Sequence, residues 1–291
     1  MPNLKEIRNR ISSVSSTMQI TSAMKMVSAA KLKRSQDAII KLRPYASKLR
    51  YIMENVSGTL DLSENLFAED RGHESVLIVA ITSNRGLCGG FNSNVIKKVQ
   101  SIIREDYNQS KVSVVCLGKK IKDAIKRTEY YFHHEAIAKH EDITASVSFE
   151  RAGEVGQVLM HLFATKECDK IVLVYNRFVN AVTQTVEVED FLPLSAPKNA
   201  ISNTASDYIF EPEKEEIIEA LIPKSLNTQL FKALLDSVAA EHAARMTAMH
   251  KATDNASELK KALKLSYNKA RQAAITNEIL EIVGGAEALN A

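Results

Sequence analysis

The chain has 291 residues, of which 45% are hydrophobic and 25% charged, and its formal net charge is +3. That length can bury one or two cores, but no apolar run is long enough to cross a membrane, and no apolar signal segment follows Met1. The three cysteines (Cys88, Cys116 and Cys168) are scattered without a CxxC pair, which argues against a disulfide framework or a zinc site and favours a reducing compartment.

Charge is distributed unevenly along the chain. Residues 1–50 carry a net charge of +9, residues 51–210 a net charge of −4 and residues 211–291 a net charge of −2. Within the last segment, residues 242–275 hold seven basic and two acidic side chains. Two basic stretches therefore flank a mildly acidic middle, which predicts an anionic partner surface. The near-neutral total and the absence of tryptophan argue against nucleic acid as that partner.

The first 57 residues predict one long helix. They contain no glycine, and their apolar residues are spaced by three and four, as in a coiled-coil seam. The seam residues are Leu4, Ile7, Ile11, Val14, Met18 and Thr21. Pro44 should kink or break this helix. Such a helix would reach roughly 80 Å, so most of it must pack along something equally long.

The C-terminal segment predicts a second long helix. Pro212 and Pro223 mark its start, and no further proline or glycine occurs before Gly284. Spacing by three and four continues from Leu235 to Ala273, with many alanines that permit close helix approach. We predict a single helix from about residue 225 to residue 289, on the order of 95 Å long.

The middle of the chain alternates between strand and helix patterns. Short runs rich in Val, Ile and Leu predict buried parallel strands at 76–81, 112–117 and 171–175. Helical stretches are expected at 93–106, 118–127 and 148–165, an edge strand at 182–188, and a loop at 195–206. This alternation predicts a small doubly wound, Rossmann-like α/β domain.

The order of these segments fixes how the two long helices can pair. The first enters the α/β segment by its C-terminal end and the last leaves it by its N-terminal end, so a pair must be antiparallel. The predicted fold class is α/β, a long antiparallel two-helix coiled coil plus a central Rossmann-like domain. Its predicted parts are an N-terminal shaft helix (1–57), the globular domain (58–210) and a C-terminal shaft helix (211–291).

A glycine-rich stretch, SNRGLCGGFN at Ser83–Asn92, lies between a predicted strand and a predicted helix, where phosphate loops occur in α/β proteins. It lacks the Lys-Ser/Thr of a P-loop and does not fit GxGxxG. We therefore favour a tight turn over a nucleotide site. Arg85 near Cys88 could lower a thiol pKa, but no histidine adjoins in sequence, so we do not expect a nucleophile.

Two groups of polar residues are candidates for reactive sites. His133, His134 and His140 occur with Glu135, Glu141 and Asp142, but their spacing matches no metal motif, and a polar surface loop is preferred. Glu278 and Glu281 share one helix face. Without a predicted pocket, they fit a solvated face or an inter-subunit salt bridge better than acid–base chemistry. The sequence therefore predicts no catalytic residue, metal or cofactor.

Three separated blocks resemble the gamma-subunit family of F-type ATP synthases, and the resemblance runs end to end. Leu4–Gln36 is similar to that family's first shaft helix. Thr82–Asn92 resembles its central glycine-rich turn, although Asn84 stands where the family usually has an acidic residue. The C-terminal block, preceded by a matching Ser237–Thr276, fits the family signature at Ile275, Thr276, Glu278, Glu281, Gly285, Ala286 and Ala288.

The resemblance implies a non-catalytic rotor subunit of bacterial type. In the family, the helix pair turns inside a ring of three alpha and three beta subunits, and the globular part stands on the membrane c-ring beside the epsilon subunit. Rotation couples proton flow to ATP synthesis or hydrolysis at the cytoplasmic face of the bacterial inner membrane. The small residues near Gly285 would then let the helix tip turn in a tight sleeve.

Family position also assigns partner contacts. Met24 and Lys25 correspond to the contact with the beta-subunit lever, Arg271, Gln272 and Thr276 to the catch near the sleeve, and Tyr208 to the foot facing the c-ring. Two alternatives stay open, namely a coiled-coil scaffold unrelated to rotation and a nucleotide-binding α/β protein with helical arms. Co-purification with alpha and beta subunits would discriminate between them.

Overall fold

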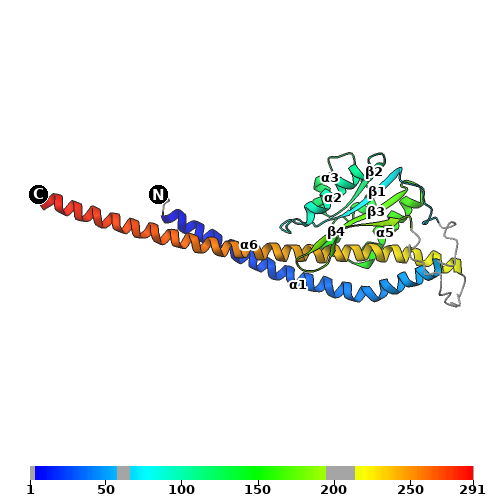
Figure 1. Cartoon of the computed structure of the whole chain (residues 1–291), viewed down its shortest axis with the longest axis horizontal. Coiled ribbons are helices and arrows are strands. Elements are labelled where there is room, and N and C mark those ends of the chain that lie inside the picture. Colours follow the sequence, from blue (N-terminus) through cyan, green and yellow to red (C-terminus); the bar gives the residue numbers. More distant parts are fainter. Residues whose placement is uncertain (1–3, 58–65, 195–213, 291) are drawn as a thin grey trace. The chain divides into compact units, whose positions relative to one another are not determined.

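The computed structural model describes residues 4–57, 66–194 and 214–290. The elements, in chain order, are α1 (Leu4–Ser57), β1 (Ser75–Ile81), α2 (Phe91–Glu105), β2 (Lys111–Leu117), α3 (Lys119–Ile125), α4 (Glu135–Ala138), a 3₁₀ turn η2 (Ile143–Ala145), α5 (Phe149–Ala164), β3 (Lys170–Phe178), β4 (Gln184–Leu192) and α6 (Lys214–Asn290). They form two compact units (Figure 1). One comprises the described parts of Met1–Ser28 and Met246–Ala291, and the other is Ala29–Arg245.

The second unit is built on a four-stranded sheet of order β2-β1-β3-β4. β1 pairs in parallel with both β2 and β3, and β4 runs antiparallel to β3 at the edge. The three predicted buried strands are confirmed. The predicted edge strand is also confirmed, although it begins at Gln184 and continues to Leu192.

Side chains of β1 alternate between two cores, because successive residues of a strand point to opposite faces. Val76, Ile78 and Ala80 pack with α2 and α3 on one face. Leu77, Val79 and Ile81 pack with α5 and with the part of α6 between Ile222 and Leu234 on the other. Figure 1 shows α2 and α3 on the side of the sheet away from α5. Helices on both faces explain why the parallel strands read as continuous apolar runs.

Both long helices run through a proline. α1 continues past Pro44, which excludes a break there. α6 begins at Lys214, well before the predicted start near residue 225, with Pro223 inside it, and this corrects the predicted start. An interior proline costs about 3 kcal/mol. Ile222 and Leu226 beside Pro223 are 1% exposed, and burial of apolar side chains of that size is worth about 1.5–3 kcal/mol each. Tertiary packing therefore outweighs the local penalty.

The segment between α3 and α5 contains short helical turns, α4 and η2, where only a polar loop was predicted. Both are anchored by buried isoleucines, Ile137 and Ile143. The predicted loop at 195–206 lies outside the described residues. No helix in the described part of the chain is long and apolar enough to span a membrane.

Candidate functional site

Within the first unit, α1 and α6 are joined by side-chain contacts whose order fixes their direction. Lys260 Nζ donates to Ser15 Oγ at 2.9 Å, the hydroxyls of Thr21 and Thr253 lie 2.8 Å apart, and Lys25 Nζ lies 3.4 Å from His250 Nδ1. Residue numbers rise along α1 as they fall along α6, so the pair is antiparallel, as predicted. Its buried seam includes Ile7, Thr21, Ser28, Met249 and Ala256.

Met24 and Lys25, assigned by resemblance to a partner contact, are half-buried on α1 in this pair. The Lys25 ammonium faces His250, and His250 Nδ1 also lies 3.3 Å from Asp254 Oδ2. The Lys25 charge is thus partly engaged by the neighbouring helix. Neighbouring Met26 and Val27 are exposed, so this part of α1 presents apolar side chains to solvent.

The C-terminal end of α6 extends past its partner helix. Extrapolating the three cross-helix pairs places Leu4, the first described residue of α1, opposite a position near residue 271. Beyond that position α6 exposes a run of large apolar side chains, and Ile282 is 71% exposed. We call this run the free end; its exposed apolar residues are Ile275, Ile279, Leu280, Ile282 and Val283. Contiguous apolar surface of this kind marks an interaction site.

All but one of the remaining residues assigned by resemblance lie on or beside the free end. Arg271, Gln272 and Thr276 are exposed on α6, and the Thr276 hydroxyl donates to the Gln272 carbonyl at 2.9 Å. Glu278, Glu281, Gly285 and Ala286 are exposed there too. A Cβ added at Gly284 or Gly285 would meet nothing within 4 Å, so no contact with the described residues requires glycine. Ala288 lies within the last helical turns of α6, and Tyr208 lies outside the described residues.

The glycine-rich loop (residues 83–90) connects β1 to α2, as predicted. The Ser83 amide donates to Asn92 Oδ1 at 3.0 Å, and the Asn92 amide donates to Cys88 Sγ at 3.2 Å. Ser83 and Cys88 are both buried. Gly89 has a φ of 58° and Leu87 a φ of 62°, and only glycine takes such a conformation without steric cost. The turn is thus filled by its own side chains, which supports the interpretation as a tight turn.

Asn84 links this loop to the next strand–helix connection. Its Oδ1 accepts from the Lys119 amide at 3.1 Å, and its Nδ2 donates to the Asp142 carbonyl at 3.4 Å. A carboxylate could make the first contact but not the second, because it carries no donor when ionised. The amide at this position therefore has a structural role that an acidic residue could fill only in part.

A buried ion pair on α6 holds the other side of the loop. Arg245 Nη1 donates to Glu241 Oε1 at 2.6 Å, and Arg245 Nη2 donates to the carbonyls of Arg85 and Gly86 at 3.1 and 3.2 Å. Arg245 and Glu241 are each 8% exposed. Burial raises the pKa of Glu241, although the Arg245 charge opposes that shift. Neighbouring His242 has its pKa lowered to about 4 by burial, helped by Arg245 and Lys31.

Side chains of the histidine-rich segment contact charged groups on neighbouring helices. His140 Nε2 lies 2.8 Å from Glu154 Oε2, Asp142 pairs with Arg151, and Glu141 pairs with Lys122. Arg151 lowers the pKa of Asp142. Across the part of the chain that the structure describes, no group of three or more histidine, cysteine or acidic residues could hold a metal.

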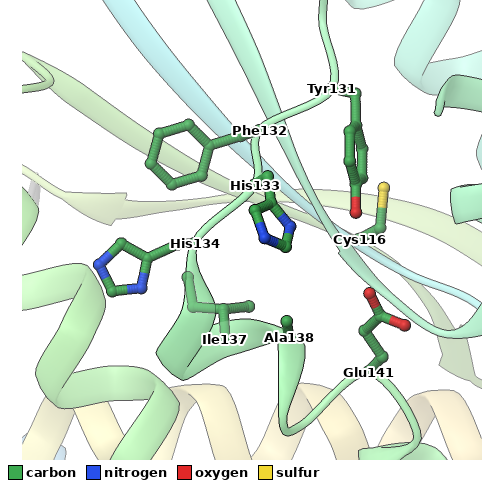
Figure 2. A pocket seen from close by; sticks show the side chains of 8 residues that line it. All are labelled: Cys116, Tyr131, Phe132, His133, His134, Ile137, Ala138 and Glu141. Atoms are coloured by element: carbon green, nitrogen blue, oxygen red, sulfur yellow. The ribbon is translucent and has the colours of Figure 1, made fainter. Parts of the chain in front are cut away.

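Figure 2 shows a small cavity beside this segment, where Cys116, Tyr131 and Glu141 converge and His133 and His134 also line the wall. The cavity measures about 10 Å³, room for at most one water. Burial, together with the nearby Glu141 charge, raises the pKa of Cys116 to about 12. A thiol that stays protonated is a poor nucleophile, so the cavity offers no reactive centre.

Sequence reasoning missed the Glu241–Arg245 pair and the buried carboxyl of Asp236. His242 and Arg245 stand at seam positions of the three-and-four spacing between Leu235 and Ala273, where apolar residues are expected. That misfit was the one available signal, because charged residues at buried positions need partners. Besides Glu241, Arg245 contacts carbonyls of a loop about 160 positions away, and a contact over such a distance cannot be read from spacing.

The chain has two long helices that flank an α/β domain in sequence and pair antiparallel. One of them has an apolar end that its partner helix does not cover. Such an architecture defines a subunit of a larger assembly. A family model described as ATP synthase matches residues 3–289. A protein of Flavobacterium johnsoniae named ATP synthase gamma chain is 59% identical, and one of Cytophaga hutchinsonii with that name is 52% identical; each match covers all of both chains. The chain belongs to the ATP synthase gamma chain family.

Solved structures share the fold. A chain of the Euglena gracilis mitochondrial ATP synthase, in a structure titled OSCP/F1/c-ring, rotational state 3, aligns with a TM-score of 0.69 at 24% identity, covering 98% of this chain and 94% of that one. A chain titled central stalk/c-ring of the Tetrahymena thermophila mitochondrial enzyme aligns with a TM-score of 0.58 at 26% identity, covering 80% and 99%. Both likenesses support the predicted fold class.

Proposed function

We propose that this chain is the central-stalk rotor subunit of an F-type ATP synthase. It couples proton flow through a membrane c-ring to ATP synthesis or hydrolysis on an alpha/beta ring by rotating inside that ring. The observation that carries the proposal is the free end of α6, a helical apolar surface that no described part of α1 covers. Family membership and the central-stalk title of the similar Tetrahymena thermophila structure support it.

The partners follow from the same assignment. Three alpha and three beta subunits surround the helix pair, while the epsilon subunit and the c-ring contact the α/β domain. The chain contributes no catalytic group, and it works as a peripheral subunit at the cytoplasmic face of the bacterial inner membrane. The described side chains fit this role, because the thiols of Cys88 and Cys116 are buried and the carboxylates of Glu141, Asp142 and Glu241 form ion pairs within the fold.

Charge and shape suit a part that turns against its neighbours. The basic stretch at 242–275 attracts acidic segments of beta subunits, and such attraction sets orientation and approach more than permanent affinity. At the free end, Gly284 and Gly285 lack side chains that would catch on a surrounding sleeve. The absence of any intrachain contact that requires these glycines is consistent with a requirement set by a partner.

The test removes two exposed side chains of the proposed catch. Arg271→Ala with Gln272→Ala should leave assembly intact, since exposed substitutions usually shift stability by less than about 0.5 kcal/mol. A hydrogen bond to a charged group is worth about 1.5–3 kcal/mol, so its loss at one rotor orientation should reduce ATP-driven proton pumping by about tenfold or more. The matched control is Gln100→Ala with Arg104→Ala, an exposed pair on α2 with the same charge change, outside the basic stretch.

Assembly, hydrolysis and pumping are measured together in reconstituted vesicles. Reduced pumping in a fully assembled complex, with the control pair near normal, supports the proposal. Unchanged pumping would remove these residues from the mechanism, whereas failure to assemble would make them structural. ATP hydrolysis by the purified chain, persisting after every trace of alpha and beta subunits is gone, would overturn the non-catalytic assignment.

A further inference from the structure

Several contacts converge on one backbone atom of the glycine-rich loop. The Arg85 carbonyl accepts from the Ser83 hydroxyl at 2.6 Å and from Arg245 Nη2 at 3.1 Å. Arg245 also reaches the Gly86 carbonyl with two of its nitrogens, at 3.2 and 3.4 Å. One side chain of α6 therefore satisfies two successive carbonyls of a loop that is remote in sequence.

The guanidinium is fixed from its own helix. Glu241, one turn before Arg245, accepts its Nη1 hydrogen bond, and the pair is almost fully buried. Arginine presents several donors in a rigid planar fork, so one group can bind a carboxylate and two carbonyls at once. Removing one member of such a buried pair leaves an uncompensated charge, which is strongly unfavourable.

Apolar packing closes the same contact. Cys88 at the loop and Phe91 at the start of α2 form a buried cluster with Ala240 of α6, against which Phe178 and Ala244 pack. Asn176 of β3 donates to the Phe91 carbonyl at 3.0 Å from a buried position. Loop, sheet and helix thus meet at one place, and the compact unit Ala29–Arg245 ends at Arg245 itself.

We propose that Arg245, held by Glu241, is a positioning residue that fastens the glycine-rich loop to α6 and fixes where the α/β domain grips that helix. The inference deepens the proposed rotor function and rests on it. A rotor passes torque from the α/β domain into α6. The attachment of the glycine-rich loop to Arg245 then determines how much of that torque reaches the part of α6 that follows Arg245.

Cys88 provides a reporter for this grip. Its thiol is 1% exposed and contacts Asn92, with Ser83 and the Arg85 carbonyl nearby. Cys116 and Cys168 are also buried, and burial raises the pKa of each to about 12. Release of the loop should therefore expose Cys88 to a maleimide while the other two cysteines stay unmodified.

The experiment labels the full chain with N-ethylmaleimide and resolves the three cysteines by mass spectrometry. Arg245→Ala should raise the labelling rate of Cys88 by at least about tenfold, since breaking a buried ion pair shifts a local opening equilibrium by more than that factor. The double variant Glu241→Gln with Arg245→Gln leaves no buried charge but removes the fork, and it should release Cys88 as well. Arg245→Lys keeps the charge and should give intermediate labelling. Arg104→Ala, an exposed arginine on α2, is the matched control and should change nothing.

Two outcomes overturn the inference. If Cys88 stays protected in both Arg245→Ala and the double variant, Arg245 does not hold the loop. If Cys116 and Cys168 become reactive together with Cys88, the substitution unfolds the domain and the grip is not local.

A second measurement connects the grip to rotation. In assembled complexes, protons pumped per ATP hydrolysed should fall in Arg245→Ala, recover partly in Arg245→Lys and remain unchanged in Arg104→Ala. Released Cys88 with an unaltered pumping ratio would refute the role in torque while leaving the contact itself established. Loss of the rotor function altogether would appear instead in the Arg271 and Gln272 test.

Discussion

Asp236 is a buried carboxyl on α6 whose ionisation weakens the fold. It is 7% exposed, and burial raises its pKa to about 6, although Lys232, Arg177 and Arg43 pull the pKa down and Glu189 pushes it up. These groups come from α6, β3, α1 and β4, so the site lies among four elements of one unit. Asp236→Asn replaces the carboxylate by a neutral group of nearly the same shape.

The expected gain follows from the pKa shift. The pKa rises from 3.8 in the unfolded reference to about 6 in the folded chain, and each unit corresponds to about 1.36 kcal/mol. Removing the whole cost of burying the ionised carboxylate would raise the free energy of unfolding by about 3 kcal/mol. Because the nearby cations lose an attractive partner in the asparagine variant, we expect a gain of about 2 kcal/mol at pH 7.5. The folded pKa lies above the unfolded one, so the penalty is absent below pH 3.8, grows between pH 3.8 and 6, and is complete above.

Urea unfolding followed by circular dichroism at pH 7.5 and pH 4.5 measures this effect. The asparagine variant should be more stable at pH 7.5, and its advantage should fall below half at pH 4.5. Asp254→Asn, which alters an exposed carboxylate on the same helix, is the control and should show little change at either pH. Destabilisation at pH 7.5, or an equal gain at both pH values, would refute the reasoning.

Three further outcomes can be checked. Gly118→Ala should destabilise the chain by more than about 2 kcal/mol in the same urea assay, because Gly118 has a φ of 118° and an added Cβ would lie 2.2 Å from the Thr82 carbonyl oxygen; a neutral result would show that the loop relaxes freely. Gly285→Ala should instead strengthen α6 by up to about 1 kcal/mol, since nothing lies within 4 Å, yet reduce proton pumping in the assembled complex; normal pumping would exclude the tight sleeve. His242, with its pKa lowered to about 4, should cost stability as pH falls from about 6.5 toward 4, and His242→Gln should flatten that slope, whereas an unaltered slope would assign it to other groups.

The α/β domain was predictable because its signals are local. The runs at Val76, Val112 and Ile171 are apolar on both faces, and such continuity is typical of parallel strands covered on both sides. The antiparallel sense of the helix pair followed from chain order alone. Family position, and not spacing or composition, supplies the partner residues from Met24 to Thr276, and these assignments stay predictions.

What sequence reasoning could not supply depends on contacts between distant residues. The start of α6 was placed too late because the proline rule is local, whereas Ile222 and Leu226 pack against a sheet that only the fold brings to them. The Arg245 grip depends on loop carbonyls, which any residue type can offer. Asp236 looks like an ordinary polar position until the cations around it are known.

The threonine contact between the two helices has a consequence for their alignment. Sliding one helix past the other by about a turn, roughly 5.4 Å, would carry Thr253 away from Thr21 and bring Met249 or Ala256, its neighbours on the buried seam, in its place. Thr21 is 9% exposed, so its hydroxyl would lose its cross-helix partner in an apolar setting and keep only the contact to the Met18 carbonyl at 3.1 Å. The contact between Thr21 and Thr253 therefore opposes sliding of the two helices. It fixes the register of the pair, and the register, together with the length of α6, determines how far α6 extends beyond α1.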